Sequence, residues 1–470
     1  VAQACASHML PPRASCHHSQ KVHHSHVNLD EPPSRNGESA GTSAVLSSAE
    51  DRLVVESSHV DFDEQLSTNG GGAGACAVPS SAQKRLRSVN ITWAKSHLAV
   101  LQRALPMNGL HAVESPCAGS SAVRGDIVWV VTANDVKQRA EVLRLQQWLS
   151  NVPGTPVICT KQGLARALAF AEEDLPWAPK TWSLPGEKTV LLEFCRKHPR
   201  CALIYKPNDA GMAEAVFLMM GEADVRQKIS NMRCHAAIAQ VYIERPLLID
   251  GRKCDLRLFI VLFCPTVGSG WRAVLFREGL VRVCAEPYAA ASRSTLHRLG
   301  THLTNTAISS LQPNGNAGNC TETLADLADR VGQNSWSTTW CAIRTMLGHV
   351  MALCQPHVPA ALCRSFQILG ADVLLDEMFE PYLLELNDLV SLKLGRTVLL
   401  GDPLVNELGL RQCTAPCFDH RAHAHAPSHT DDQVKVPLVA NVLTVVQRLH
   451  SHGSEIPDGL LFGGLDFDVL

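Results

Sequence analysis

The sequence predicts an α+β (α/β) protein, because runs typical of buried strands alternate with segments of helical spacing. Residues 256–263, apolar except for Arg257, are typical of a buried strand, and residues 336–353 have the apolar spacing of a helix. Two further apolar runs, 371–375 and 381–387, flank a short polar segment and indicate a β-hairpin. This mixture excludes an all-β architecture.

The composition permits a sizeable hydrophobic core and argues against nucleic acid as a partner. Of the 470 residues, 46% are hydrophobic and 19% charged, and the formal net charge of −3 gives no indication of nucleic-acid binding. The 17 cysteines include no Cys-x-x-Cys pair and are expected to be reduced thiols of a cytosolic protein. We expect no membrane span, because no run of about 18 apolar residues is present, and the first residues lack the apolar core of a secretory signal.

The first 87 residues are rich in Ser, His, Ala and Gly and are predicted to be a disordered, low-complexity extension. The stretch from Ser67 to Gly72, for example, sustains neither a helix nor a strand. The histidines between His17 and His26 could bind a metal, although a solvated polar tail is the simpler interpretation. Order is expected from about Ser88.

Length and spacing predict the other elements. Strands are expected at 126–131 and 202–205, with 271–283 as the returning strands of a meander. Helices are expected at 135–150, 161–173 and around 190–194, and a βαβ-like stretch at 237–263. Residues 311–335 are predicted to be a loop with a weak helix. The segment 434–449 is predicted to be a closing amphipathic helix with Pro437 in its first turn.

The hairpin carries the most informative chemistry. Asp372 lies in its first strand, and Glu385 and Asn387 lie two residues apart in its second strand, so both point to one face. The short turn lets Asp372 come opposite them. Two carboxylates and an amide oxygen are ligands suited to Mg²⁺. The alternative is a hairpin whose polar face is simply solvated.

A second group of possible ligands lies near the C-terminus. Its Cys-x3-Cys spacing followed by histidines could bind Zn²⁺ but fits no common finger, and the prolines around it favour a loop. The group comprises Cys413, Cys417, His420, His423, His425 and His429.

Four segments together resemble the tubulin tyrosine ligase-like family. They are 151–164, with N-x-P-G followed by T-K-x-x-L; 240–257 (QVYIERPLLIDGRKCDLR); 302–305 (HLTN); and 369–387, with L-G-x-D followed by L-L-E-x-N. The resemblance runs discontinuously from about Asn151 to Leu449. It implies an ATP-grasp fold with N-terminal, central and C-terminal lobes. The implied division is an extension at 1–87, lobes at 88–200, 201–290 and 291–453, and a tail at 454–470.

The resemblance also implies site roles. Lys206 would contact the ATP phosphates, and the face formed by Lys253, Asp255 and Arg257 would meet the nucleotide and the reacting groups. Arg282 would lie near the acceptor or amino-acid site, and His302 and Asn305 would line the floor. The adenine hinge would be formed by Gln240, Val241, Tyr242 and Ile243. Without the family, Lys206, Arg282, His302 and Asn305 are more simply structural or surface residues, and the hinge and the face of Lys253 fit an ordinary strand as well as a site.

The implied activity is an ATP- and Mg²⁺-dependent ligase that adds an amino acid, glutamate by preference, to tubulin tails through an acyl phosphate. The implied location is the cytoplasm and cytoskeleton, including the cilium or flagellum and basal body. Alternatives are a tubulin tyrosine ligase, an ATP-grasp ligase that acts on another protein or a small acid, and a catalytically weak tubulin-binding pseudoenzyme. The last is motivated by Met212, Ala213 and Ala215, which replace a basic residue and two glycines in the phosphate loop.

Overall fold

A computed structural model describes residues 85–115, 123–208, 216–230, 236–304, 321–399 and 423–470; nothing is described of the side chains of 396–399 and 423–426. Residues 1–84 of the predicted extension, the phosphate-loop residues 209–215, Asn305, and Cys413, Cys417 and His420 of the His/Cys group therefore lie outside the described residues. Within these ranges helices and sheets are mixed, which confirms the α+β prediction and is consistent with an ATP-grasp-like fold.

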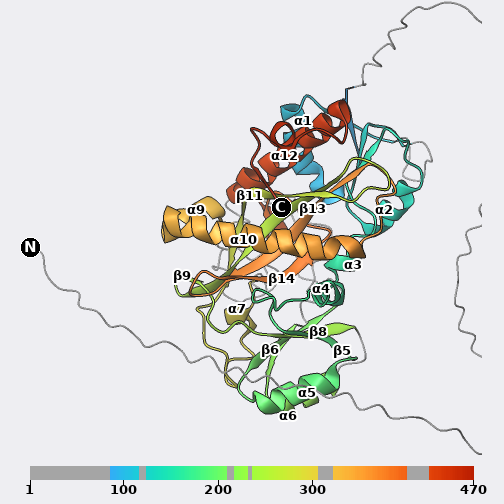
Figure 1. Ribbon diagram of the computed structural model, residues 1–470. Helices are drawn as coiled ribbons and strands as arrows, with labels where there is room; N and C mark the ends of the chain where they lie inside the picture. Colours follow the sequence, from blue (N-terminus) through green and yellow to red (C-terminus); the bar gives the residue numbers. More distant parts are fainter. Residues whose placement is uncertain (1–84, 116–122, 209–215, 231–235, 305–320, 400–422) are drawn as a thin grey trace, which may run out of the picture. The chain divides into compact units, whose positions relative to one another are not determined.

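Eleven of the described strands form one large sheet (Figure 1), ordered β12-β11-β10-β13-β4-β3-β1-β2, with β14 on β13, β17 on β11 and β9 on β10. Their bounds are β1 (Ser88–Trp93), β2 (His111–Val113), β3 (Ile127–Val130), β4 (Trp148–Leu149), β9 (Leu248–Ile249), β10 (Arg252–Cys264), β11 (Arg272–Val283), β12 (Thr321–Thr323), β13 (Ser365–Leu375), β14 (Pro381–Asn387) and β17 (Phe467–Val469).

A smaller sheet has the order β5-β8-β6-β7, with strands β5 (Thr181–Leu184), β6 (Ala202–Pro207), β7 (Phe217–Met220) and β8 (Ala237–Val241). A two-stranded ribbon pairs β15 (Arg396–Leu399) with β16 (His423–Ala426). The helices are η1 (Lys95–His97), α1 (Leu98–Met107), α2 (Ala133–Ala140), α3 (Pro156–Cys159), α4 (Lys161–Leu168), α5 (Lys188–Lys197), α6 (Glu222–Ser230), α7 (Leu299–His302), α9 (Leu324–Val331), α10 (Gln333–Cys354), η3 (Gln355–His357), α12 (His429–His452) and α13 (Asp458–Leu461).

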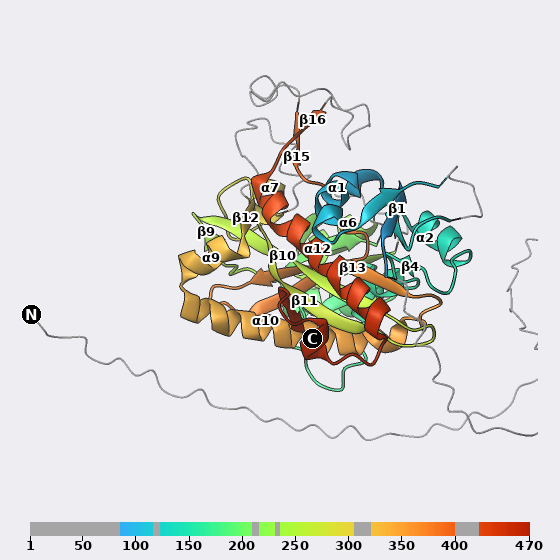
Figure 2. The same ribbon diagram turned by 90° about the horizontal axis from the view of Figure 1, so that it is seen from above.

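The alternation of β10 explains how the large sheet is covered on both faces. Phe259, Val261 and Phe263 pack into one core with α1 and α12. The intervening Leu258, Ile260 and Leu262 pack into another core with α9 and α10. Figures 1 and 2 show α12 and α10 on opposite sides of the sheet. The small sheet has its own core against α5 and α6.

The sequence predicted several elements correctly and some incorrectly. The strand at 126–131, the strand-helix-strand unit from Thr181, the long strand β10, helix α10 and the β13–β14 hairpin are confirmed. The predicted returning strands at 271–283 are one strand, β11. The lobe boundaries stay a prediction; the small sheet takes strands from 181 to 241, and β10 and β11 belong to the large sheet.

The helix predicted at 135–150 is wrong beyond Ala140. Trp148 lies in β4, fully buried and paired with Ile127. The turn before it is held by Gln147, whose side chain accepts from the Arg144 amide (2.9 Å) and donates to the Gly125 carbonyl (2.7 Å). The helix predicted at 161–173 ends at Leu168, because Phe170 is 70% exposed and no apolar face continues.

Three further expectations are corrected. No helix interrupts 237–263, a stretch that the structure describes completely. The predicted weak helix at 311–335 is the full helix α9, started by a capping box of Thr323 and Asp326. Helix α12 begins at His429, where Ser428 caps it, so Pro437 lies in the helix interior rather than in the first turn.

Candidate active site

The candidate site lies on one face of four adjacent strands of the large sheet. Asp255 and Arg257 of β10 are paired across strands with Arg282 of β11 and Asp372 of β13 respectively. Asp372 in turn is opposite Glu385 of β14, which confirms the predicted hairpin register. Residues opposite each other in neighbouring strands point to the same face. These five residues are called the charged row below.

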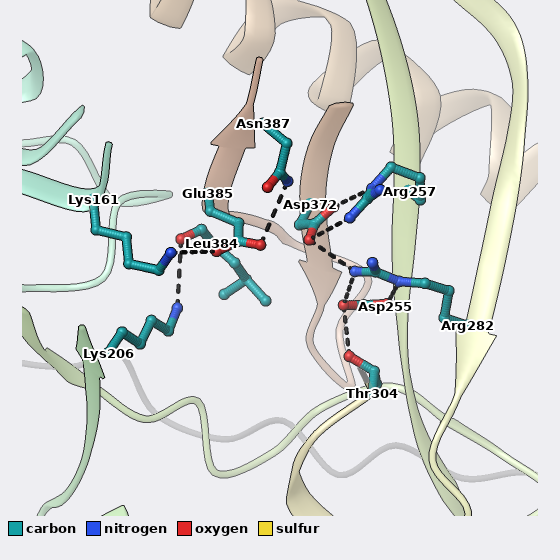
Figure 3. Close-up of polar contacts among 10 residues, drawn as sticks. All are labelled: Lys161, Lys206, Asp255, Arg257, Arg282, Thr304, Asp372, Leu384, Glu385 and Asn387. Carbon is teal, nitrogen blue, oxygen red and sulfur yellow. Dashed lines mark hydrogen bonds and ion pairs between the residues drawn. The ribbon is translucent and has the colours of Figure 1, made fainter. Parts of the chain in front are cut away.

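Ion pairs join the two arginines and the two aspartates of the charged row (Figure 3). Arg257 donates to both oxygens of Asp372, at 2.5 and 3.1 Å, and Arg282 donates to both oxygens of Asp255, at 2.8 and 2.5 Å. Arg282 Nη2 also lies 2.9 Å from Asp372 Oδ2 and so bridges the two carboxylates. Thr304 donates a further hydrogen bond to Asp255, at 2.6 Å. Bidentate pairs of this kind fix both partners in orientation.

The aspartates of these ion pairs are buried, so each needs an opposite charge as a partner. Asp255 and Asp372 are only 3% and 4% exposed. Burial would raise the pKa of Asp372, but Arg257 and Arg282 outweigh it and hold the pKa well below its usual range. Burial likewise would lower the pKa of Arg282, and the two aspartates raise it instead. Asp372 therefore carries full negative charge at neutral pH.

The predicted metal trio is brought together on the hairpin. Asn387 Nδ2 lies 3.4 Å from Glu385 Oε1, and Asp372 also interacts with the Glu385 carboxyl. In the described part of the chain no three His, Cys, Asp or Glu side chains form a metal-binding group, and the trio has two carboxylates and one amide. Its hard oxygen donors fit Mg²⁺. Asp372, however, already contacts two guanidinium groups, so Glu385 and Asn387 are the more available ligands.

The small sheet presents Lys206 toward this hairpin. Lys206 Nζ donates to Gln240 Oε1 at 2.9 Å and lies 3.5 Å from the carbonyl of Leu384. A register shift in the β13–β14 pairing makes Leu384 an extra residue. Lys206 is 9% exposed, and burial lowers its pKa although Glu385 opposes the change. Lys161, at the start of α4, lies 3.7 Å from Glu385.

Lys253 lies two residues before Asp255 on β10, as the alternation predicts. Its side chain contacts Tyr242, however, and not the residues of the charged row. Its Nζ donates to the hydroxyl of Tyr242 at 3.1 Å, and Tyr242 also interacts with His302. His302 is 1% exposed and lies behind Tyr242, so it does not form an open floor. Burial lowers the pKa of Lys253 to about 8.

The predicted hinge is only partly available for a base. The amide of Val241 donates to Lys180 (2.9 Å) and that of Tyr242 to Ala202 (3.0 Å). An adenine contact would therefore fall to the carbonyl groups or to Ile243.

Sequence reasoning missed three groups in the site: Lys161, Thr304 and the carbonyl of Leu384. Lys161 and Thr304 stand inside the T-K and H-L-T-N segments, so these motifs are the signal that could locate them. The Leu384 carbonyl depends on the register shift, which leaves no mark in the sequence.

The sequence matches one family model and several curated relatives. The model of the "Tubulin-tyrosine ligase family" matches residues 138–398. "Tubulin polyglutamylase ttll6" from Danio rerio is 30% identical over 291 residues, covering 56% of this chain and 36% of the relative. "Tubulin polyglutamylase TTLL13" from Mus musculus is 28% identical over 63% of this chain and 39% of the relative. "Tubulin polyglutamylase TTLL7" from Homo sapiens is 27% identical over 56% and 32%.

The chain thus spans between about a third and two fifths of the length of these relatives. Among the described residues, no helix is long and apolar enough to cross a membrane. The family match covers more than half of the chain and includes every strand of the charged row. The chain belongs to the tubulin-tyrosine ligase family.

Proposed function

We propose that the chain is an ATP-dependent ligase that forms an amide between a carboxylate of tubulin and an amino acid, with glutamate preferred. The observation that carries the proposal is the charged row beside two buried lysines, Lys206 and Lys253. The named activities of the relatives support the same reaction class and tubulin as its substrate.

The proposed reaction has two steps. An oxygen of the tubulin carboxylate attacks the γ-phosphorus of ATP, ADP leaves, and an acyl phosphate forms. The amine nitrogen of the amino acid then attacks the acyl carbon, phosphate leaves, and the nitrogen loses a proton. No covalent enzyme nucleophile is required, which agrees with the pKa of each buried thiol near the site, Cys254 and Cys284, being raised by burial to about 12.

The residues divide this work by charge. Lys206 and Lys253 would bind phosphate oxygens, because each ammonium is buried against neutral oxygen partners. Arg257 and Arg282 would stabilise charge developing on the transferred phosphoryl group or orient the carboxylates. Mg²⁺, held by Glu385, Asn387 and Asp372, would neutralise phosphate charge when bound. Gln240 orients Lys206 through a hydrogen bond, and its own amide donates to Thr181 at 3.0 Å.

The test is incorporation of labelled amino acid. The 470-residue chain, ATP, Mg²⁺ and tubulin are incubated with labelled glutamate, or with labelled tyrosine in a parallel reaction. We expect glutamate incorporation that is lost in Glu385→Gln, whose side chain is partly exposed and whose loss leaves the fold intact. Incorporation of tyrosine alone would reassign the chain as a tyrosine ligase. No incorporation of either, with ATP still bound, would support a tubulin-binding pseudoenzyme, the alternative that Ala213 and Ala215 favour.

A further inference from the structure

One line of hydrogen bonds joins the two sheets next to the candidate site. It starts at Lys253 on β10 of the large sheet and passes through Tyr242, just after β8 of the small sheet. It continues through His302, at the end of α7, and ends on the carbonyl of Thr295. The three steps measure 3.1, 3.0 and 3.1 Å. Lys253, Tyr242 and His302 are 6%, 5% and 1% exposed, so water does not compete for these bonds.

The direction of each bond follows from its end point. The Thr295 carbonyl only accepts, so His302 Nε2 carries a proton and donates to it. Burial lowers the pKa of His302, so the ring is neutral and Nδ1 is an acceptor. The Tyr242 hydroxyl must then donate its proton to Nδ1, which turns its oxygen lone pairs toward Lys253.

The surroundings hold this line in one geometry. The rings of Tyr242 and His302 meet edge to face at 5.5 Å and 89°. The ring of Tyr288 also meets His302 edge to face, at 6.2 Å and 90°, and the side chain of Tyr288 interacts with that of Tyr242. Tyr242 belongs to a small core with Ala202 and Leu296, which ties it to the small sheet and to the segment before α7. The Thr295 carbonyl also accepts from the Arg298 amide at 2.9 Å.

We infer that Tyr242 and His302 are positioning residues that hold the Lys253 ammonium at the junction of the two sheets, poised for a phosphate group of the nucleotide. A lysine has three N–H donors, and Tyr242 uses one of them. The inference rests on the proposed function for its ligand. It assigns His302 a role through Tyr242 and Lys253 rather than contact with substrate.

Several titratable or charged groups act on Lys253 besides Tyr242. Burial and, to a smaller extent, Lys206 lower its pKa to about 8, against the opposing effect of nearby acidic groups. The loss of the Tyr242 oxygen removes an acceptor from the charged form and should lower the pKa of Lys253 again. The groups whose charge acts on Lys253 are Asp255 and Cys254 on β10, Cys284 after β11 and Lys206 on β6, and Lys253 in turn acts on His302 of α7.

The experiment compares four variants of the full chain. Tyr242→Phe removes the hydroxyl, and His302→Leu removes the acceptor of its proton. His302→Asn is the conservative variant, because its side-chain oxygen can replace Nδ1. Tyr205→Phe is the matched control: Tyr205 is also a buried tyrosine, 3% exposed and stacked on Phe217, but outside this line of bonds.

Two measurements are made on each variant. The Kd for ATP-Mg is measured by calorimetry at pH 7, and the pKa of Lys253 is measured by NMR with lysine labelled at Cε, the signal being assigned through Lys253→Arg. We expect Tyr242→Phe to weaken ATP binding roughly tenfold and to lower the pKa of Lys253. His302→Leu should change both in the same direction, His302→Asn should restore ATP binding to within about threefold of wild type, and Tyr205→Phe should match wild type.

The two measurements separate the inference from the proposed function. If the Lys253 pKa moves in Tyr242→Phe and His302→Leu but wild type binds no ATP, the positioning of Lys253 is supported and the proposed function fails. If Tyr242→Phe leaves both the pKa and the ATP affinity at wild-type values, the inference is overturned. Equal losses in His302→Asn and His302→Leu, with an unchanged Lys253 pKa, would also overturn it.

Discussion

The buried charges of the charged row and of the two buried lysines have different kinds of partner. In the charged row, Asp255 and Asp372 are each bonded to arginine side chains. Lys206 and Lys253 are instead bonded to neutral oxygens, those of Gln240, Leu384 and Tyr242. A closed ion pair holds structure, whereas a buried cation with neutral partners keeps net charge for an anion. The comparison separates residues that mainly build the site from residues that mainly bind.

The largest expected effect is the loss of a carboxylate from the charged row. Asp372→Ala leaves Arg257 and Arg282 without a shared partner, and we expect the free energy of unfolding to fall by about 3–5 kcal/mol. Glu385→Gln is the control, because Glu385 has 26% side-chain exposure, its ion-pair contact with Lys161 is as long as 3.7 Å, and glutamine keeps an oxygen for the contact with Asn387; its change should stay below about 1 kcal/mol. Urea denaturation of both variants measures this, and equal losses would contradict the comparison.

The next largest effect is the loss of stability at low pH. Burial acts against the charge of Asp372, but Arg257 and Arg282 prevail and hold its pKa low. Its contribution is therefore present above the unfolded pKa of about 3.9 and is lost as the pH falls below that value, because the unfolded chain then binds the extra proton. We expect wild type to lose about 2–3 kcal/mol more than Asp372→Asn between pH 5 and pH 2. If wild type and Asp372→Asn lost the same stability over this pH range, the arginines would not hold the carboxylate ionised.

Lys253 should behave in the opposite sense. Its pKa is lowered by burial to about 8 in the folded chain, from 10.5. The unfolded chain therefore binds more protons between these values, and its burial destabilises the fold at neutral pH by an amount that shrinks as the pH rises. We expect Lys253→Met to be more stable than wild type at pH 7, on the order of 2 kcal/mol, while losing ATP affinity. The difference in stability between Lys253→Met and wild type should shrink between pH 8 and 10.5. A difference independent of pH would refute the lowered pKa of Lys253.

The smallest effect is expected at the edge of the site. Lys161→Ala removes the 3.7 Å contact with Glu385, between side chains that are 18% and 26% exposed. Such a pair contributes at most about 1 kcal/mol, and salt should screen it. Measuring the unfolding of wild type and variant at low and high salt tests this. A loss as large as that of Asp372→Ala would place Lys161 with the charged row.

The sequence predicted the parts of the site that depend on local pattern. The period of two placed Asp255 beside Arg257 and Glu385 beside Asn387, and the short turn placed Asp372 opposite Glu385. It did not predict the pairing of Arg257 with Asp372, because those residues are 115 positions apart and their contact depends on the register of two distant strands. Likewise, Trp148 was assigned to a helix because its strand has only two residues and is defined by its neighbours.

The register shift in β14 also changes which face each residue occupies. Alternation alone would put Leu383 on the same side as Glu385, yet Leu383 packs in the core with α10. The extra residue, Leu384, reverses the phase between them.

That irregularity has a consequence for mutational studies. The Leu384 group that faces Lys206 is a main-chain carbonyl, so it persists whichever side chain occupies position 384. A scan that replaces side chains one at a time would score this position as tolerant and overlook the link between the sheets. Removing one amino acid from the strand, or exchanging the peptide bond for an ester, would reveal it.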